Sequence, residues 1–431
     1  MPYRTRTEPS PLTVLHLVQP VEGGVARVVT DLVRAQIADG LRAEVACPPG
    51  GELAERAAEA GARVHDWPAA RAPGPGLPRE LWTAARLIRR SRPDLVHAHS
   101  AKAGLVARLA VRGRVPTVFQ PHAWSFDAVE GRAAELSRVW ERYGTRWSTR
   151  TLCVSETERR AGENAGIAAR WAVIRNGVDL GHFGPGEPPT GHGDSRNTGH
   201  GDGTDTGHDD SRNTGHGDGT NGGTAGRDRR RQRAGLPELT GVPDGAPVVL
   251  CVGRLCRQKG QDVLLAAWPE VRAAAPEARL VLVGDGPDRA ALTRLAPPGV
   301  RFAGAIRDIR PWLRAADVVV LPSRWEGMAL APLEAMACGR PVVVTDVSGA
   351  RESLPPGHDA HALVPPEDPR ALAAALGALL ADPGLRDRLG REARDHTRAT
   401  GDVRRTAAAV TGLYQDLLNS PPTSTRKRTR R

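Results

Sequence analysis

The pattern of apolar and polar positions divides the chain into two similar halves, separated by a stretch that has no apolar residue. In the first half, short apolar runs alternate with longer segments whose apolar residues recur at helical spacing. The short runs predict strands and the longer segments predict amphipathic helices. The predicted strands are 12–18, 43–49, 62–67, 94–99, 116–122, 151–155 and 171–177, and helical segments include 25–40, 79–91 and 103–113.

The second half repeats this alternation with runs that are almost continuously apolar. Such runs are expected where both faces of a parallel sheet are covered by helices, because no strand position then faces water. An amphipathic segment, 402–418, follows the last run. The predicted strands of this half are 247–255, 279–286, 300–304, 317–322, 340–346 and 361–366.

The stretch between the halves is a polar duplication. Residues 190–205 recur at 206–221 with two differences, and neither copy contains an apolar residue. Such a segment cannot repay the entropy of becoming ordered, so we expect a disordered linker. Its four histidines could chelate a metal, but a duplicated polar linker is the simpler interpretation.

These patterns predict two doubly wound, Rossmann-like α/β domains and a connecting insertion. We place the first domain at 1–185, the linker at 186–233 and the second domain at 234–400. A C-terminal helix at 401–420 is expected to pack back toward the first domain, and a basic tail occupies 421–431.

Composition and charge narrow the class of protein. The chain has 431 residues, 40% of them hydrophobic, which is enough to bury two cores, and its formal net charge is +11. Five of the basic residues lie in the last six positions, RKRTRR, so the excess over the rest of the chain is modest. No run of about 18 apolar residues predicts a membrane span, and the first residues do not resemble a secretory signal. A nucleic-acid-binding protein would need a basic stripe with interleaved aromatic residues, and none is evident.

Cysteine usage indicates a reducing compartment. The five cysteines, at 47, 153, 251, 256 and 338, form no C-x-x-C pair, and no histidine cluster has the spacing of a zinc site. Free thiols in a cytosol are therefore expected.

Lysine is rare in this chain, whose basic residues are almost all arginine. The only lysines are Lys102, Lys259 and Lys427. Because the two side chains are not interchangeable at a tight site, the internal lysines indicate places where a compact ammonium is required. Lys102 could be a surface lysine at a helix start, or a contact to an acceptor or a phosphate.

Candidate binding residues follow two predicted strands of the second half. In open α/β sheets ligands bind beyond the carboxyl ends of strands. Arg254 and Lys259 follow the strand that ends at Gly253, where a pair of cations could hold a diphosphate; a solvated basic loop is the alternative.

The strand that ends near Ser323 leads into a helix that begins after Gly327. The free N–H groups at such a helix start attract an anion. Glu326 lies before that helix and Glu334 within it, with a rise of roughly 9 Å between residues 328 and 334. One carboxylate could therefore serve each end of a nucleotide-diphosphate-sugar.

Several motifs resemble one enzyme family. GRLCRQKG, LVGDGP, FAG and EGMALAPLEAMACGRPVVVTD are similar to the donor-binding half of the retaining family 4 glycosyltransferases, which have the GT-B fold. EGMALAPLE matches that family's Glu-x7-Glu motif. In the first half, GGV, HAHSAKAGLVARLA, PHAWSF and NGVDLGHF resemble segments of the same family in the same order, with the exopolysaccharide-type members as the nearest pattern.

The resemblance implies a role for each matching residue. Glu326 would hold hydroxyls of the sugar and His122 would lie near the transferred sugar, so both are catalytic candidates. Ala123 stands where the family usually has glycine. Its side chain bears on how closely the backbone at this position approaches the sugar. The donor-binding candidates are Arg254 and Lys259 for the diphosphate, Glu334 for the ribose, the N–H groups of Gly327, Met328 and Ala329 for phosphate, and Gly23 and Gly24 for closing the cleft.

The resemblance also implies an activity. The expected reaction moves a sugar from a nucleotide-diphosphate-sugar to a glycan or lipid-linked acceptor with retention of configuration, without a metal or other cofactor. A GT-B sugar-nucleotide epimerase or phosphorylase is the alternative among enzymes, and a basic nucleic-acid-binding protein is the alternative of another class. We expect a cytoplasmic protein.

One further segment, 137–150, combines arginines and aromatic residues. Arg138, Arg142, Arg146 and Arg150 recur at steps of four, opposite Leu136, Trp140, Tyr143 and Trp147. We favour a helix whose aromatic face lies in the core and whose arginines are solvated. The alternative is an interfacial helix in contact with anionic lipid at the inner face of a membrane.

Overall fold

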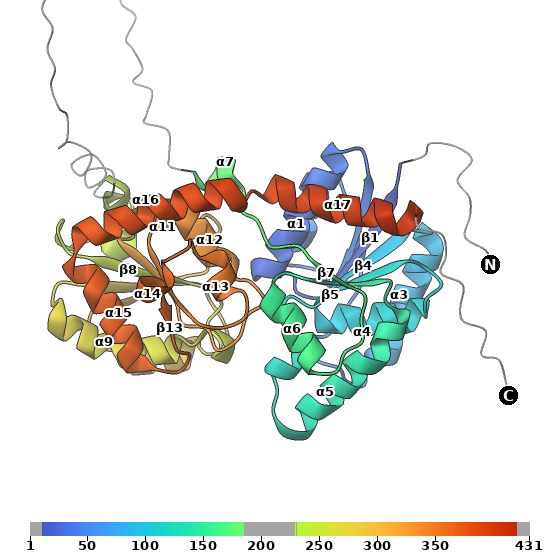
Figure 1. The fold of residues 1–431 in the computed structure, drawn as a ribbon, viewed down its shortest axis with the longest axis horizontal. Helices are drawn as coiled ribbons and strands as arrows, with labels where there is room; N and C mark the ends of the chain where they lie inside the picture. Colours follow the sequence, from blue (N-terminus) through green and yellow to red (C-terminus); the bar gives the residue numbers. More distant parts are fainter. Residues whose placement is uncertain (1–10, 185–228, 230, 420–431) are drawn as a thin grey trace, which may run out of the picture.

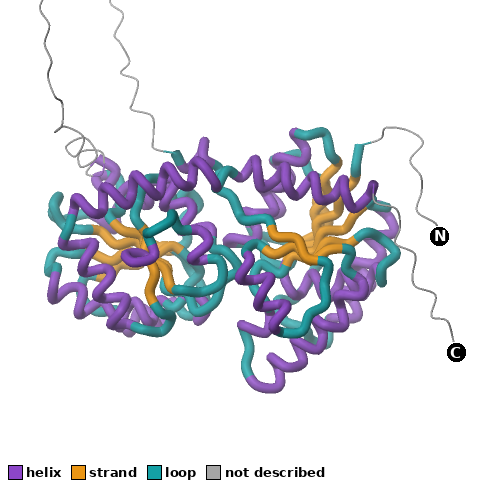
Figure 2. The backbone as a smooth tube through the Cα atoms, in the orientation of Figure 1, coloured by secondary structure: helices purple, strands orange, loops and turns teal. Residues whose placement is uncertain are grey.

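The computed structural model describes residues 11–184, 229 and 231–419. These residues form two α/β domains side by side, each with a central sheet between layers of helices (Figures 1 and 2). The predicted linker repeats, 190–221, and the basic tail, 421–431, lie outside the described residues.

The N-terminal domain is built on a seven-stranded sheet in which every pair is parallel. Its strand order, β3-β2-β1-β4-β5-β6-β7, reverses between β1 and β4, which is where such sheets bind ligands. The strands are β1 (Thr13–Val18), β2 (Arg42–Cys47), β3 (Arg63–Asp66), β4 (Leu95–His99), β5 (Thr117–Gln120), β6 (Arg150–Cys153) and β7 (Trp171–Val173). The helices are α1 (Gly23–Ala38), α2 (Glu52–Glu59), α3 (Leu77–Ser91), α4 (Ser100–Val111), α5 (Gly131–Gly144) and α6 (Glu156–Asn164), with short 3-10 turns at Ser125–Asp127 and Thr145–Trp147. The short helix α7 (Leu180–Phe183) follows β7 and packs against α12 (Leu330–Ala337) of the C-terminal domain (Figure 1).

The C-terminal domain has a six-stranded parallel sheet in the order β10-β9-β8-β11-β12-β13. Its strand order reverses between β8 and β11. The strands are β8 (Val248–Val252), β9 (Arg279–Val283), β10 (Val300–Gly304), β11 (Val318–Leu321), β12 (Val342–Thr345) and β13 (Leu363–Val364). The helices are α9 (Gln261–Ala274), α10 (Arg289–Leu295), α11 (Arg310–Ala315), α12 (Leu330–Ala337), α13 (Ala350–Ser353), α14 (Asp359–Ala362), α15 (Pro369–Ala381) and α16 (Pro383–Thr400), with 3-10 turns at Arg257–Lys259 and Pro237–Leu239.

The last helix, α17 (Val403–Asn419), follows α16 and crosses to the N-terminal domain, where it lies along α1 (Figure 1). Its Tyr414 is fully buried, and the hydroxyl lies 2.5 Å from Nδ1 of His97 on β4. At the crossing, the N–H of Val178 donates to the Gly401 carbonyl at 2.8 Å. The chain therefore passes between the domains at both ends of the second one.

The central strands are buried on both faces, as their apolar runs predict. All residues of β4 and β8 are buried, and so are Val14 to Val18 of β1. On β1, Leu15 and Leu17 join one hydrophobic cluster with β4, α3 and α4. Val14 on the opposite face packs with α1 and α17. The predicted architecture of two doubly wound parallel sheets is confirmed.

The prediction for 137–150 is wrong in two respects. Helix α5 ends at Gly144, and the segment then forms a 3-10 turn and enters β6. The expected aromatic face is only partly buried: Leu136 is 70% exposed and Tyr143 is 44% exposed, whereas Trp140 is half-buried, with the Arg108 guanidinium 5.2 Å from its ring centroid. The buried side of α5 contains Glu141, which forms a 2.9 Å ion pair with Arg108 in the interior.

The remaining global expectations concern thiols and membrane spans. All five cysteines are free, and only Cys256 is partly exposed. Among the described residues, no helix combines the length and the apolar character that crossing a bilayer requires.

Candidate active site

The loop after β8 is pressed against the end of β11. It forms a 3-10 turn over Arg257–Lys259 and continues through Gly260, which has a φ of 65°. A Cβ at Gly260 would lie 2.0 Å from the carbonyl oxygen of Pro322, so only glycine permits this approach. The contact brings the loop's basic residues to the strand end that precedes α12.

Lys259 and Glu326 form an ion pair at this junction. The hydroxyl of Ser323 also donates to Oε1 of Glu326, at 2.7 Å, and the carboxylate is largely buried. Arg254 follows β8 directly and is exposed, and its side chain has no partner among the described residues. The structure thus places both predicted cations at the sheet's switch point, one held by Glu326 and one unpaired. A small pocket beside Glu326 is lined by Ser323, Ala329, Thr345 and Ser348, among others.

In the part of the chain that the structure describes, the three residues before α12 have free amide groups. Within the described chain, no hydrogen bond is made by the N–H groups of Gly327, Met328 or Ala329. Their carbonyls face the other domain: Gly327 accepts from Ser155 Oγ at 3.2 Å and Met328 accepts from Asn176 Nδ2 at 2.8 Å. The free N–H groups give this helix start the character of an anion site.

Gly327 also lies against the backbone of the N-terminal domain. A Cβ there would lie 2.7 Å from the backbone carbonyl carbon and oxygen of His122. Any larger residue would therefore force the two domains apart. The motif's glycine is required by this approach of the N-terminal domain as well as by access to a ligand.

Glu334 lies within α12 and pairs with Arg27 of α1. Its side chain is only 2% exposed, and its Oε2 has no hydrogen-bond partner. Burial raises the pKa of Glu334, and the Arg27 guanidinium opposes that shift. Sequence reasoning missed Arg27, although it lies in the first turns of the helix that Gly23 and Gly24 begin. Both glycines are exposed at the start of α1, and Gly23 has a φ of 77°.

His122 follows β5 and adopts a φ of 59°, and the next residue, Ala123, has a φ of 150°. Its Nε2 lies 3.0 Å from Nδ1 of His99, and burial lowers the pKa of His122 to about 3. The imidazole is therefore neutral at physiological pH.

A buried histidine cluster adjoins His122. His16, His97 and His99 are fully buried and offer nitrogens that all lie within 4.8 Å of one another. The three residues are brought together by strand pairing, so the absence of zinc spacing along the sequence did not reveal them. The signal of this cluster in the sequence is H-A-H on one strand, facing a histidine on the neighbouring strand.

Lys102 lies away from this constellation. Its ammonium pairs with Glu80 at 2.7 Å and donates to the Ala72 carbonyl at 3.0 Å, and the side chain is 3% exposed. These contacts hold the end of α3 against α4. The geometry gives Lys102 a structural role and no access to an acceptor or a phosphate.

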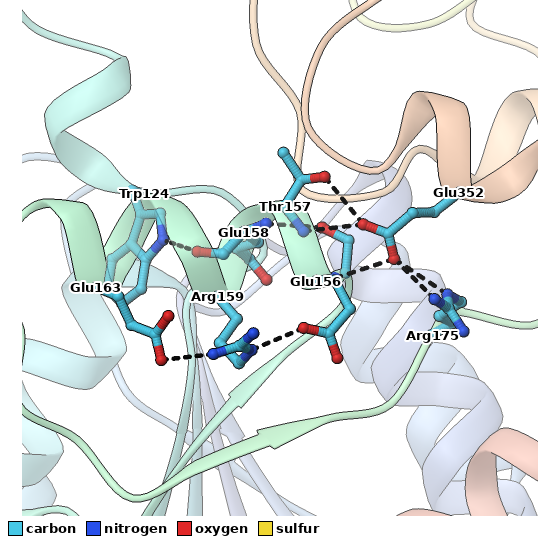
Figure 3. A network of polar contacts seen from close by, with 9 residues as sticks. Trp124, Glu156, Thr157, Glu158, Arg159, Glu163, Arg175 and Glu352 are labelled. Atoms are coloured by element: carbon cyan, nitrogen blue, oxygen red, sulfur yellow. Dashed lines mark hydrogen bonds and ion pairs between the residues drawn. The ribbon is translucent and has the colours of Figure 1, made fainter.

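A polar network joins the domains at the start of α6 (Figure 3). Glu352 of α13 accepts from the backbone N–H groups of Glu156 and Thr157 at 3.0 and 2.8 Å, and pairs with Arg175 at 2.9 Å. Burial opposes the ionisation of Glu352, but these hydrogen bonds together hold its pKa below the ordinary value. Glu352 therefore caps a helix of the other domain.

Comparisons with known proteins identify the family of both domains. The family model described as Glycosyltransferase Family 4 matches residues 22–182, and that described as Glycosyl transferases group 1 matches residues 246–382. The chain carries the two domains of a family 4 glycosyltransferase. The first match contains β2 to β7 and the second contains β8 to β13. The second match also contains the whole donor-side constellation from Arg254 to Glu334.

Curated relatives share part of the glycosyltransferase chain. It is 37% identical over 171 residues to a GDP-mannose-dependent monoacylated alpha-(1-6)-phosphatidylinositol monomannoside mannosyltransferase of Corynebacterium glutamicum, which covers 37% of this chain and 44% of the relative. It is 38% identical over 201 residues to a D-inositol 3-phosphate glycosyltransferase of Xylanimonas cellulosilytica, covering 44% of this chain and 47% of the relative. The matches thus span about half the length of these relatives.

A solved structure supports the GT-B fold of this glycosyltransferase. Anabaena HepE in complex with UDP and glucose superposes with a TM-score of 0.72 at 21% identity, covering 94% of this chain and 99% of that one. At this identity the likeness establishes the arrangement of the two domains, and roles of single residues depend on the geometry above.

Proposed function

We propose that this glycosyltransferase moves a sugar from a nucleotide-diphosphate-sugar to a glycan or lipid-linked acceptor, with retention of anomeric configuration. The observation that carries the proposal is the unpaired anion site at the start of α12. There, within the described residues, the N–H groups of Gly327, Met328 and Ala329 are free, and Lys259 pairs with the preceding Glu326. Arg254 lies in the same loop as Lys259, and Glu334 lies further along α12.

This arrangement suits the cleavage of a sugar–phosphate bond. The step builds positive charge on the anomeric carbon and negative charge on the departing diphosphate. Lys259, Arg254 and the helix start would stabilise that diphosphate without rearranging, which is the main source of catalysis in such sites. These cations would take the electrostatic role that a metal plays in other transferases.

The carboxylates would bind the two ends of the donor. Glu326 is held by Lys259 and Ser323, so its remaining acceptor capacity is oriented toward the cleft and would receive sugar hydroxyls. Glu334 keeps one buried oxygen without a partner, and a ribose hydroxyl would satisfy it. His122 would lie beside the transferred sugar, with Gly23 and Gly24 at the opposite wall.

The names of relatives guide the choice of substrates. Relatives include enzymes that use GDP-mannose and, in Escherichia coli, a UDP-Gal:alpha-D-GlcNAc-diphosphoundecaprenol alpha-1,3-galactosyltransferase that is 27% identical over 63% of this chain. We infer a nucleotide-sugar donor and an acceptor of envelope or exopolysaccharide assembly, at the cytoplasmic side of the membrane.

A thermal-shift screen with UDP-, GDP- and ADP-sugars, followed by a transfer assay with the stabilising donor, tests the proposal. Binding to the folded state raises Tm by mass action, so one donor class should stabilise the wild type. Lys259→Ala should remove that shift and lower transfer by roughly 100-fold or more, as for loss of one preorganised donor group. Arg294→Ala, an exposed arginine of α10, is the charge-matched control. Full transfer by Lys259→Ala would refute the assigned role.

We further propose that α5 contacts an anionic membrane surface. Leu136, Val139 and Tyr143 share one exposed side of this helix, with the Arg146 guanidinium 3.5 Å from the Tyr143 ring centroid. Exposed apolar residues flanked by arginines are typical of interfacial helices. Vesicles containing anionic lipid should co-sediment the protein, and Leu136→Gln with Arg146→Gln should weaken that binding. Equal binding by this double variant would contradict the proposal, and Trp82→Gln, at an exposed tryptophan of α3, controls for general apolar exposure.

A further inference from the structure

Three buried side chains form a continuous row of hydrogen bonds that ends at the half-buried His122. The row begins at Gln36 of α1, whose Oε1 lies 2.9 Å from Nε2 of His16. Nδ1 of His16 lies 3.0 Å from Nε2 of His99, and Nδ1 of His99 lies 3.0 Å from Nε2 of His122. The row therefore runs from α1 across β1 and β4 to the cleft.

Each nitrogen–nitrogen contact in this row must contain one hydrogen. A neutral imidazole has one N–H donor and one acceptor nitrogen, whereas a charged one has two donors. Burial lowers the pKa of His16 to about 4 and that of His122 to about 3, and it lowers the pKa of His99 well below its ordinary value. All three rings are therefore neutral, and each donates on one side and accepts on the other.

The direction of the row is fixed at its inner end. The amide oxygen of Gln36 can only accept, so His16 carries its hydrogen on Nε2 and has a lone pair on Nδ1. His99 must then donate from Nε2 to His16, and it accepts on Nδ1 from the Nε2–H of His122. The remaining nitrogen of His122, Nδ1, is consequently an acceptor.

We propose that Gln36, His16 and His99 are positioning residues that hold His122 in its Nε2–H tautomer, so that Nδ1 accepts a hydrogen bond from a hydroxyl of the transferred sugar. The tautomer is a property of the protein alone, whereas its use toward the sugar rests on the function proposed above. The contact with Gly327 independently fixes the backbone of His122, and the row of hydrogen bonds fixes the orientation of its ring and the nitrogen that carries the proton.

Neighbouring groups enclose the row without interrupting it. The ring of His97 stacks on His99 with centroids 3.9 Å apart, and its Nδ1 is engaged by Tyr414 of α17. Gln120 of β5 lies opposite His99 in the sheet register and is buried. No carboxylate or cation hydrogen-bonds to His16, His99 or His122 within the described residues.

A metal ion is the competing explanation for His16, His97 and His99. Two imidazole nitrogens bound to one tetrahedral zinc at 2.0–2.1 Å would lie about 3.3 Å apart. The 3.0 Å between His16 Nδ1 and His99 Nε2 is instead the length of a hydrogen bond.

Nitrogen-15 NMR of histidine-labelled protein tests the tautomer directly, with His122→Gln used to assign the resonance. We expect His122 to carry its proton on Nε2 in the wild type. Gln36→Leu should populate both tautomers of His122 and lower kcat at least about tenfold, the usual cost of losing an orienting hydrogen bond, with a smaller change in KM. Gln120→Leu is the matched control, because it removes a buried amide beside the row and leaves the row intact.

Several results would overturn the proposal. A proton on Nδ1 of His122 in the wild type would do so without any variant, even if Gln36→Leu failed to fold. An unchanged tautomer in folded Gln36→Leu would do the same. A joint shift of His16, His97 and His99 resonances at one equivalent of zinc would identify a metal site instead.

The outcomes also separate this inference from the proposed function. If Gln36→Leu mixes the tautomers but transfers normally while Lys259→Ala is inactive, the role toward the sugar fails and the transferase function stands. If the wild type turns over no nucleotide-sugar, the proposed function and the role toward the sugar both fail, and the NMR result still decides the tautomer.

Discussion

At the scale of single residues, the backbone beside the candidate site is strained at Ala123. Its φ of 150° lies in a region that residues with a side chain rarely adopt, and it follows His122, whose φ is also positive. The family resemblance expects glycine at this position. The departure therefore leaves the backbone in the conformation that glycine would favour, with alanine carrying the strain.

We predict that Ala123→Gly stabilises the protein. Removing the Cβ relieves the strain, and this gain should exceed the added entropy of the unfolded chain, giving about 1 kcal/mol in urea denaturation. Ala128→Gly is the control, because Ala128 has an ordinary φ of −92° and glycine there should cost about 0.5–1 kcal/mol. Equal destabilisation by both substitutions would show that the backbone at Ala123 is not strained.

The two internal lysines show how far residue-level inference reaches. The rarity of lysine indicated positions that require a compact ammonium, and both ammonium groups do form ion pairs with glutamates. Both follow a strand at the switch point of their sheet, Lys102 after β4 and Lys259 after β8. Lys102 pairs with Glu80, a residue of another helix, and no local pattern announces such a partner. The chemistry of each lysine was thus visible in the sequence, whereas its location was not.

At the scale of elements, α6 contains a carboxyl group in an unfavourable setting. Glu158 is fully buried at its start, where Ser155 caps the helix by accepting from the Glu158 N–H at 3.0 Å. Its side chain accepts from the Val154 N–H at 2.7 Å, but its other oxygen has no partner. Burial raises the pKa of Glu158 to about 8.

We predict that Glu158→Gln removes a pH dependence of stability. A raised folded-state pKa means that the native state holds a proton that the unfolded state loses above about pH 4.5. Stability should therefore fall as pH rises from about 5 to 8, by up to a few kcal/mol, and the glutamine variant should lack this decline. Urea denaturation at both pH values measures it. Glu163→Gln, on the exposed side of α6, is the control, and parallel profiles for wild type and Glu158→Gln would contradict the assignment.

Helices and strands were predicted well where the pattern of apolar residues determines which side is buried. They were predicted poorly where polar side chains are buried. The strands of both sheets could be predicted from continuous apolar runs, because such runs are stable only in the interior of a sheet that is covered on both faces. In α5, the pattern assigned Tyr143 to the core, whereas the interior accommodates Glu141 because Arg108 neutralises it there. The histidine cluster was missed for a related reason, because it is assembled from β1 and β4 by strand pairing and not by spacing along the chain.

At the scale of the whole molecule, the residues of the candidate donor site are also the contacts between the domains. Arg27 reaches Glu334, and the carbonyls of Gly327 and Met328 are held by Ser155 and Asn176. We therefore expect the spacing of the two domains to be coupled to the geometry of the anion site. A contact that stabilises closure without lining the site should change donor affinity through this coupling.

Glu352 is such a contact, since it lies at the edge of the interface and caps α6 with three hydrogen bonds, two from backbone N–H groups and one from the Thr157 hydroxyl at 2.9 Å (Figure 3). The start of a helix attracts carboxylates. The other cap of α6, Ser155, belongs to the N-terminal domain, so Glu352 is the cap that joins the two domains. We predict that Glu352→Ala opens the domains, which small-angle X-ray scattering would show as a larger radius of gyration.

The same substitution should raise KM for the donor severalfold while kcat changes less, because the open form must close before it binds. Arg351→Ala is the matched control: it is the preceding residue on α13, but its side chain pairs only with Asp346 and Asp359 of its own domain. If both variants scatter like the wild type and bind donor equally well, Glu352 is not what holds the cleft closed. If the radius of gyration increases only in Glu352→Ala, the cap that Glu352 provides for α6 determines the balance between open and closed protein.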